Sequence, residues 1–326
     1  MITVKLQLGI FSAILSFMSI LLNCIIFTPV YQLAFVQKKS QVYIIAFFNI
    51  ITDLLQMFYV FFYISPSIIF EDYIVADQME SKAVIFMGTV YMTLWYMESL
   101  IQVLMGVNRY VVIVLRKSYL FTFRSTIFYL FPLTLLSAFT AYIIQYVTPC
   151  CDFVFDHKIL SFNFIRIPGV LNYSKYAFDM PINASCSIIA IICYVAVMMT
   201  VRRNSASLSG AVADARRKQD IRYTGQFCLV NGFYTLTWCF FETLPYLLKD
   251  RTFEWYYLVP LMITLNCCSN AVVYLIVNKE VKSNLGDGVI SKLFGIAKPS
   301  VSQVTSLGNR ALDGKSSHNI DEEHII

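Results

Sequence analysis

The sequence predicts an all-α integral membrane protein, a bundle of seven transmembrane helices. Seven apolar stretches, each long enough to cross a bilayer, occur within 326 residues. Hydrophobic residues make up 58% of the chain and charged residues only 14%, and the mean hydropathy is +0.64. This composition is too apolar for a soluble domain of this size. The chain is therefore expected to fold inside a membrane.

Each stretch is expected to be a helix, because a bilayer core about 30 Å thick needs roughly 20 residues at 1.5 Å each. Backbone amides in hydrocarbon must also be bonded within their own segment. The predicted helices cover residues 8–30, 42–64, 83–110, 126–146, 176–201, 226–248 and 256–277.

A short amphipathic helix is predicted after the seventh span, over residues 279–294, where apolar residues recur every fourth position. One domain is expected over residues 1–294. The polar, serine-containing segment 295–326 is predicted to be a disordered cytoplasmic tail. No cleaved leader is expected, because the first apolar run has full spanning length.

The distribution of lysine and arginine predicts the orientation. The loops after the first, third and fifth helices are richer in these residues than the alternate loops. They carry Lys38, Lys39, Arg116, Lys117, Arg124, Arg202, Arg203, Arg216, Arg217, Lys218 and Arg222. This bias places those loops in the cytoplasm, the N-terminus outside and the C-terminus inside. The glycosylation sequon at Asn172 then falls in an outer loop. A second sequon, at Asn183, falls inside a helix and is expected to stay unused.

Two motifs at predicted helix ends resemble those of rhodopsin-like G-protein-coupled receptors. Asn108-Arg109-Tyr110 resembles the acidic-Arg-Tyr motif, with Asn108 in place of the acid. Residues 270–274, Asn-Ala-Val-Val-Tyr, resemble the Asn-Pro-x-x-Tyr motif, with Ala271 in place of proline.

The arrangement is similar to that of nematode serpentine chemoreceptors, most nearly class X, over roughly residues 8–285. The resemblance rests on 108–110, on Thr-Pro-Cys-Cys at 148–151, on Arg-Arg-Lys-Gln-Asp at 216–220 and on the run 273–281. It implies a multi-pass plasma-membrane receptor for a small external ligand, coupled to a heterotrimeric G protein.

Arg109 is the first candidate switch residue, because a charge at membrane depth needs a partner or water. By resemblance its resting partner is Asp220, with Tyr110 beside it, in a lock between the third and sixth helices. The alternative is that Arg109 snorkels to the headgroups. Trp238 lies eighteen residues after Asp220, five helical turns along the same face. By resemblance it is the hinge beneath the ligand pocket, although packing alone would also explain it.

Asp53, in the middle of the second helix, is costly in hydrocarbon and should find polar partners. By resemblance it belongs to a sodium-and-water pocket with Asn23, Asn266 and Asn270. Glu98, eleven residues before Arg109, departs from the family pattern. Two nearby carboxylates either share a proton or hold a cation, so a sodium ion at Asp53 and Glu98 is one expectation. The other expectation is that both acids are buried in neutral form and serve only as polar packing groups.

Ligand contacts are predicted at Trp238, Glu242 and Tyr256, towards the outer half of the bundle. Tyr194 and Tyr274 match tyrosines that, in this superfamily, bridge helices on the cytoplasmic side. Of nine cysteines, only Cys150 and Cys151 fall in predicted outer loops, and adjacent cysteines are expected not to pair. No cysteine lies in 66–90, so the family's usual disulfide is not expected.

Other function classes fit poorly. The three histidines lie outside the predicted helices, and no HExxH or Ser/His/Asp arrangement exists, so no catalytic or metal site is expected. The net charge of +5 follows membrane orientation and does not indicate a nucleic-acid partner. The seventh helix has no lysine for retinal, and no internal repeat suggests a transporter. The alternatives are a receptor-like protein with altered motifs that does not signal, and a seven-helix ligand-gated channel.

Overall fold

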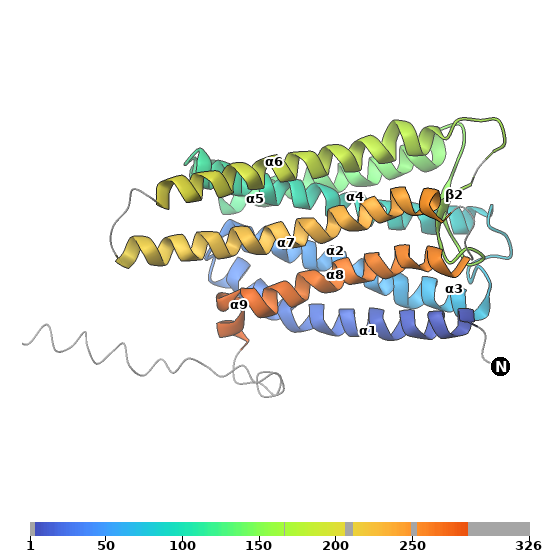
Figure 1. Cartoon of the computed structure of the whole chain (residues 1–326), viewed down its shortest axis with the longest axis horizontal. Coiled ribbons are helices and arrows are strands. Elements are labelled where there is room, and N and C mark those ends of the chain that lie inside the picture. Colours follow the sequence, from blue (N-terminus) through green and yellow to red (C-terminus); the bar gives the residue numbers. More distant parts are fainter. Residues whose placement is uncertain (1–3, 166, 206–210, 249–252, 286–326) are drawn as a thin grey trace, which may run out of the picture. The chain divides into compact units, whose positions relative to one another are not determined.

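The computed structural model describes residues 4–165, 167–205, 211–248 and 253–285. Within these ranges, it describes only the backbone at 204–205, 211–220, 222–223, 227 and 253. Almost every described element is a helix (Figure 1).

The helices follow the predicted order. They are α1 (Val4–Tyr31), α2 (Gln41–Tyr59), α3 (Ser65–Phe70), α4 (Lys82–Arg109), α5 (Phe123–Tyr142), α6 (Met180–Ser205), α7 (Ala211–Leu247), α8 (Leu258–Val277) and α9 (Lys279–Asn284). Single π-helical turns extend several of them: η1 (Gln32–Val36), η2 (Val60–Ile64), η3 (Tyr110–Val114), η5 (Ile143–Val147) and η6 (Ser174–Asp179). Short 3₁₀ turns form η4 (Ser118–Leu120) and η7 (Phe253–Tyr257).

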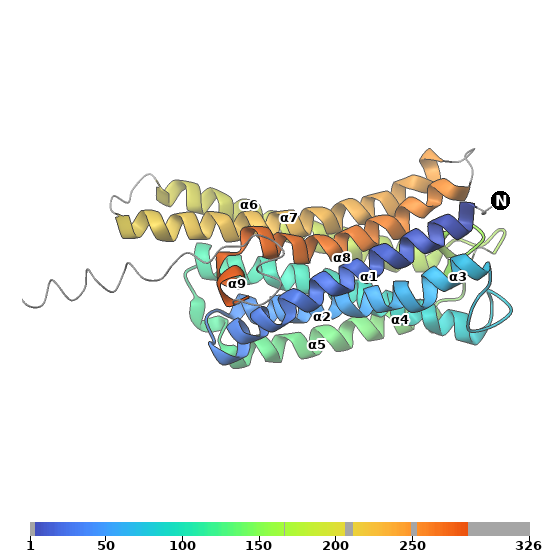
Figure 2. The same ribbon diagram turned by 90° about the horizontal axis from the view of Figure 1, so that it is seen from below.

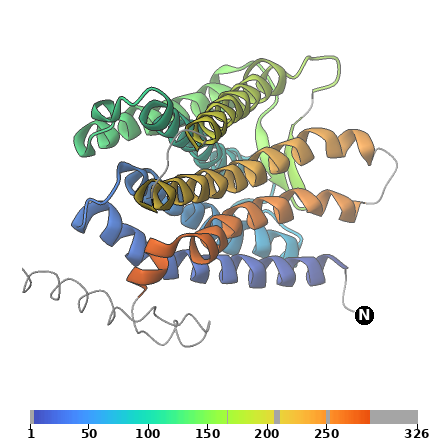
Figure 3. The ribbon, with the colours of Figure 1, turned by 60° about the vertical axis from the view of Figure 1, so that its left-hand side comes forward.

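Seven long helical segments result, because η2 joins α2 and α3 into one stretch, Gln41–Phe70. Among the described residues, six stretches are long and apolar enough to cross a membrane. The seventh, α7, runs beside α8 in all three views (Figures 1 to 3), and the two helices are in contact. Polar Asn231, Thr237 and Glu242 lower its hydropathy.

The surface of the bundle is apolar, unlike that of a soluble protein, and polar side chains are buried within an otherwise apolar core. Large apolar side chains point outward, including Phe62 at 65% exposure, Phe128 at 70% and Ile192 at 61%. Polar Asn23, Asp53, Gln56, Glu98 and Asn270 are fully buried. This distribution suits a lipid solvent, in which the interior supplies the hydrogen-bond partners.

Helix α4 lies at the centre, in contact with α2, α5, α6 and α7. Helix α1 packs against α2, α3 and α8. The central position of α4 brings its polar residues within reach of α2, α6, α7 and α8.

A β-hairpin interrupts the otherwise helical chain, and the sequence analysis did not anticipate it. Strand β1 (Phe153–Asp156) pairs antiparallel with β2 (Ser161–Phe164). The Gln145 side chain holds it, because its Nε2 donates to Phe153 O at 2.8 Å and its Oε1 accepts from Phe153 N at 2.7 Å. The hairpin lies against α4 at Gly88, at the end of the bundle where α1 begins (Figure 1).

After α8 the chain turns at Asn278, whose Oδ1 accepts from the backbone N–H groups of Glu280 and Val281. Glu280 then pairs with Lys39 at 3.0 Å and accepts from the Tyr43 hydroxyl at 2.6 Å. These contacts hold α9 against the start of α2. Residues 286–294 of the predicted amphipathic helix and the tail 295–326 lie outside the described residues.

Replacing Gly88 with alanine is expected to lower stability, because the added Cβ would lie 1.9 Å from the carbonyl oxygen of Phe153. The hairpin backbone must then move, at a cost of about 1–3 kcal/mol. Thermal unfolding in detergent measures this loss. The control is Gly225→Ala, because a Cβ there meets nothing within 4 Å. Equal melting temperatures for the two variants would contradict the close approach.

Candidate functional site

The polar residues predicted around Asp53 do gather at the centre of the bundle. Asp53 Oδ2 accepts from Asn270 Nδ2 at 2.7 Å and from Asn49 Nδ2 at 3.2 Å. Asn23 joins from α1 by a different route, because its Nδ2 donates to the backbone oxygen of Cys267 at 3.2 Å. Helices α1, α2 and α8 therefore meet through this network.

Glu98 links α2 and α8 to α4. Its Oε2 accepts from Gln56 Nε2 at 2.8 Å, and its Oε1 accepts from Asn266 Nδ2 at 2.6 Å. All three side chains are buried. Each carboxylate oxygen of Glu98 thus has an amide donor from a different helix.

The two carboxylates lie close together. One oxygen each of Asp53 and Glu98 and the sulfur of Cys267 are all within 4.8 Å of one another. Several buried oxygens around them have no hydrogen-bond partner among the described residues. They are Asp53 Oδ1, Asn23 Oδ1, Asn266 Oδ1 and Asn270 Oδ1. Unpaired oxygens of this kind are the ligands that hard cations prefer.

A second polar cluster lies nearer the hairpin. Asp179 Oδ1 accepts from the Tyr96 hydroxyl at 2.7 Å and from Asn183 Nδ2 at 2.9 Å. Asn183 Oδ1 in turn accepts from the Tyr234 hydroxyl at 2.7 Å and from Trp95 Nε1 at 3.0 Å. The other oxygen of Asp179 is buried without a partner among the described residues.

A small cavity of about 30 Å³ lies beside this cluster, between α4, α7, α8 and the hairpin. Its wall is mostly aromatic and aliphatic, with Asp179 and Thr237 as the polar members. The lining residues are Tyr91, Met92, Trp95, Phe153, Phe162, Asp179, Thr237, Phe241, Val259 and Ile263. A space of this size holds one or two water molecules.

The hairpin covers this cavity with aromatic rings. Phe162 stacks on Tyr91 with ring centroids 4.1 Å apart, and Phe153 stacks on Phe162 at 5.2 Å. The end of β1 is fixed to the loop between α3 and α4, because the Tyr73 hydroxyl donates to Asp156 Oδ1 at 3.0 Å. His157 packs edge-on against Tyr73, and burial lowers the pKa of its imidazole.

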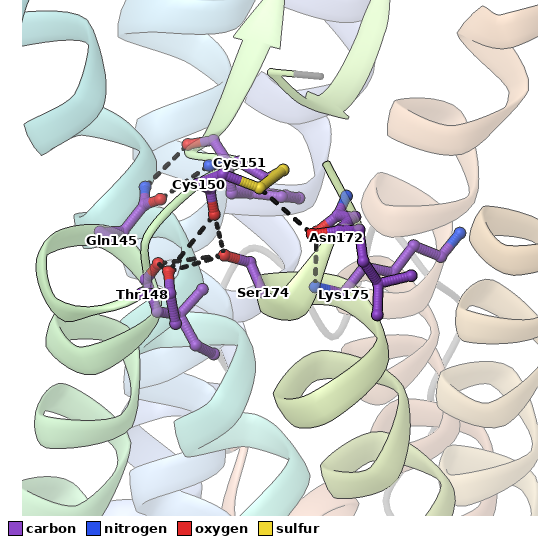
Figure 4. Close-up of a disulfide and its surroundings, with 10 residues drawn as sticks. Gln145, Thr148, Cys150, Cys151, Asn172, Ser174 and Lys175 are labelled. Carbon is purple, nitrogen blue, oxygen red and sulfur yellow. Dashed lines mark hydrogen bonds between the residues drawn. A yellow bond between two sulfur atoms is a disulfide. The ribbon is translucent and has the colours of Figure 1, made fainter. Parts of the chain in front are cut away.

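The expectation that adjacent cysteines would not pair is wrong. Cys150 and Cys151 form a disulfide just before β1 (Figure 4). Cys151 adopts a φ of +81°, a turn that replaces the extended backbone on which neighbouring side chains point apart. The Ser174 hydroxyl donates to Cys150 O at 2.9 Å, which ties this turn to the start of η6 (Figure 4).

At the opposite end of the bundle, Arg109 lies within electrostatic range of the Tyr194 and Tyr274 phenol groups. Both tyrosines are buried, at 4% and 2% exposure, on α6 and α8. The predicted bridging tyrosines and the predicted switch arginine therefore share one region. Tyr110 begins η3, directly after α4. Asp220 belongs to α7, but its side chain lies outside the described residues.

Comparison with known proteins identifies the family. Residues 13–278 match the family described as "Serpentine type 7TM GPCR chemoreceptor Srx". The chain belongs to this family. The receptor is therefore a multi-pass membrane protein of a chemoreceptor family and not an enzyme. No curated protein matches it significantly.

The fold is also that of a rhodopsin. A crystal structure of squid rhodopsin superposes with a TM-score of 0.69, at 15% identity, covering 90% of this chain and 86% of that one. At this identity the likeness concerns the fold alone. It agrees with the seven-helix arrangement of the receptor.

Trp238, Glu242 and Tyr256, the residues predicted to contact a ligand, do not line the receptor's cavity. Glu242 is buried and forms an ion pair with Lys175 at 3.0 Å. Trp238 is half-buried on α7, next to the lining residue Thr237. Tyr256 is half-buried in η7. Asn172 precedes η6, where its Oδ1 accepts from the backbone N–H of Lys175 at 2.8 Å.

Sequence reasoning missed Gln56 and the Asp179 cluster. Gln56 follows Asp53 by three positions, so helical spacing already placed both side chains on one face. The sequence identifies Asn183 only as part of a glycosylation sequon and not as a hydrogen-bonding partner inside the bundle. Asp179 stood close to a predicted helix start, where an acidic residue is unremarkable.

Substitutions at Glu98 test whether its two hydrogen bonds hold the receptor together. Glu98→Leu leaves the Gln56 and Asn266 amides buried without an acceptor, at about 1–3 kcal/mol for each. We expect a clearly lower melting temperature in detergent. Glu98→Gln should stay close to the parent receptor, because either neighbouring amide can turn its oxygen toward the new donor. Equal melting temperatures for the two variants would show that the bonds contribute nothing.

Proposed function

We propose that this receptor binds a small external ligand in the half of the bundle beneath the hairpin and activates a heterotrimeric G protein. The observation that carries the proposal is the aromatic cavity with the buried, unpartnered oxygen of Asp179 in its wall. Apolar walls with a few placed polar groups are typical of small-molecule sites. The matching ligand is a small, mostly apolar molecule with an N–H or O–H donor for Asp179.

The cavity must widen to admit such a ligand, because it has room for only one or two waters. Movement of the hairpin or of the Phe241 side chain would enlarge it. Glu242 stands one turn from Trp238 on α7, and the Lys175–Glu242 ion pair lies at the same end of α6 and α7. A ligand would contact Trp238, Glu242 or Tyr256 only after the cavity has widened.

The signal is a shift between two packings of the bundle. A ligand held between α4, α6, α7 and α8 favours the packing in which Arg109 leaves Asp220, with Trp238 as the hinge. A cytoplasmic cleft then opens between α4, α6 and α7, and Tyr194 and Tyr274 bridge the separated helices. Basic residues at its rim would receive the G protein: Arg202, Arg203, Arg216, Arg217 and Lys218.

This mechanism needs the N-terminus outside and the C-terminus inside, as the lysine and arginine bias predicts. Asn172 then faces the exterior and is available for glycosylation. Asn183 is buried and hydrogen-bonded, so its sequon would remain unused.

A sodium ion fits the centre of the bundle. Asp53 and Glu98 supply the negative charge, and Asn23, Asn266 and Asn270 offer unpaired oxygens. Such an ion would offset one of the two negative charges and lower the repulsion between the two carboxylates. A proton shared between the two carboxylates satisfies the same constraint.

A larger side chain in the cavity wall should block the ligand. Ile263→Phe adds volume where only about 30 Å³ exists, so the half-maximal agonist concentration should rise at least about tenfold. The assay is calcium release in cells co-expressing a promiscuous G protein, screened with small apolar amines and alcohols. Leu265→Phe, on the exposed side of α8, is the control. An unchanged response of Ile263→Phe at equal surface expression would place the ligand elsewhere.

Removing the proposed lock should raise activity without ligand. Asp220→Asn deletes the negative charge that holds Arg109, which favours the open packing. We expect basal second-messenger production above that of the parent receptor. Asp214→Asn, on the same helix, is the matched control. Equal basal activity in both variants at equal surface expression would remove the lock from the mechanism.

A further inference from the structure

A second, larger cavity lies away from the proposed ligand site. It is a groove of about 500 Å³ between α6 and α7. Its lining residues are Ile191, Tyr194, Val195, Met198, Cys228, Asn231, Gly232, Thr235, Leu236 and Cys239. Ile191, Val195 and Leu236 are 46%, 50% and 46% exposed, so the groove opens on the outer face of the bundle. In a membrane this opening faces lipid.

Three polar atoms in this groove have no hydrogen-bond partner among the described residues. They are Asn231 Oδ1, Thr235 Oγ1 and Tyr194 Oη, and all are buried. Asn231 is only 5% exposed and Tyr194 only 4%. An unpaired polar group surrounded by hydrocarbon costs several kcal/mol, so a partner that enters from the membrane is favoured.

The polar groups lie partway along the groove. Cys228 and Met198 line its end towards Arg109, and Ile191 and Cys239 line the opposite end. Asn231 and Tyr194 lie between these ends. Gly232 opens space in the wall, because a Cβ built there meets nothing within 4 Å. The cavity therefore fits a mostly apolar molecule that places one polar group at Asn231 and Tyr194 and extends from there towards Ile191 and Cys239.

We propose that this groove binds a membrane sterol, with its single hydroxyl group against Asn231 and Tyr194. A hydroxyl donates one hydrogen bond and accepts others, so it can donate to Asn231 Oδ1 and accept from the Tyr194 hydroxyl. An acyl chain of a phospholipid cannot do this, because it carries no polar group at this depth. The rigid ring system also loses little conformational freedom on binding.

The position of the site gives it a regulatory consequence. Tyr194 lines the groove and also lies within electrostatic range of Arg109. A sterol that holds the Tyr194 hydroxyl and fills the space between α6 and α7 stabilises one spacing of these helices. The binding itself does not depend on the proposed signalling function, and it is tested without any agonist.

The test is photolabelling of the full-length protein in phosphatidylcholine vesicles with a photoreactive 3β-hydroxysterol, followed by mass spectrometry of the labelled peptides. We expect label on α6 and α7. Gly232→Phe fills the groove and should reduce the label at least about fivefold, the effect of losing roughly 1 kcal/mol. Gly225→Phe is the matched control, because it lies on the same helix in open space and outside the groove.

A second variant tests the hydroxyl recognition. The parent protein should label about fivefold more with the 3β-hydroxysterol than with its 3-deoxy analogue, the effect of one hydrogen bond. Asn231→Leu should bring this ratio towards one while keeping the thermal stability of the protein. Equal labelling of Gly232→Phe and Gly225→Phe, or equal labelling by the two sterols in the parent protein, would overturn the proposal. Ile191→Trp closes the groove from α6 and replaces Gly232→Phe if that variant does not fold.

Discussion

The receptor depends on one constraint, the need to pair polar groups inside a membrane, where hydrocarbon offers no hydrogen-bond partners. Glu98 is the clearest case, because its two oxygens receive amide donors from α2 and α8 while its backbone belongs to α4. A carboxylate at this depth is costly alone, and the surrounding amides offset that cost only while the helices stay together. The same group that would oppose membrane insertion therefore fixes the packing of three helices.

The same logic extends outward from the centre. Asp179, Asn183 and Tyr234 join α6 to α7, and Tyr96 attaches α4 to the same cluster. Each unpaired oxygen that remains, at Asp53, at Asp179 or at Asn231, marks a place where the protein's own residues do not complete the network. The proposed cation, ligand and sterol would each supply a partner for one of these unpaired oxygens, at three places in the bundle.

Specific hydrogen bonds hold the hairpin at its end of the bundle. Gln145 binds both the N–H and the carbonyl of Phe153, and the disulfide turn at Cys150 is held by Ser174. The cavity therefore has a cover that is fastened to η5 and to the start of η6. Widening of the cavity must act against these bonds, which couple the hairpin to the helices that line the cavity.

Composition and spacing by themselves determined the helical class and the number of long helices, and the family resemblance implied the grouping of Asp53, Glu98 and Asn270. These follow from local rules: an apolar run of spanning length must be helical in lipid, and a buried acid must find polar partners. The tertiary structure decided what local rules cannot reach. Gln56 bonds to Glu98 because α2 and α4 pack in one particular rotation. The hairpin forms because Gln145 offers it hydrogen bonds and Gly88 leaves it space. The pairing of Cys150 with Cys151 depended on a single positive backbone angle, which no spacing pattern encodes.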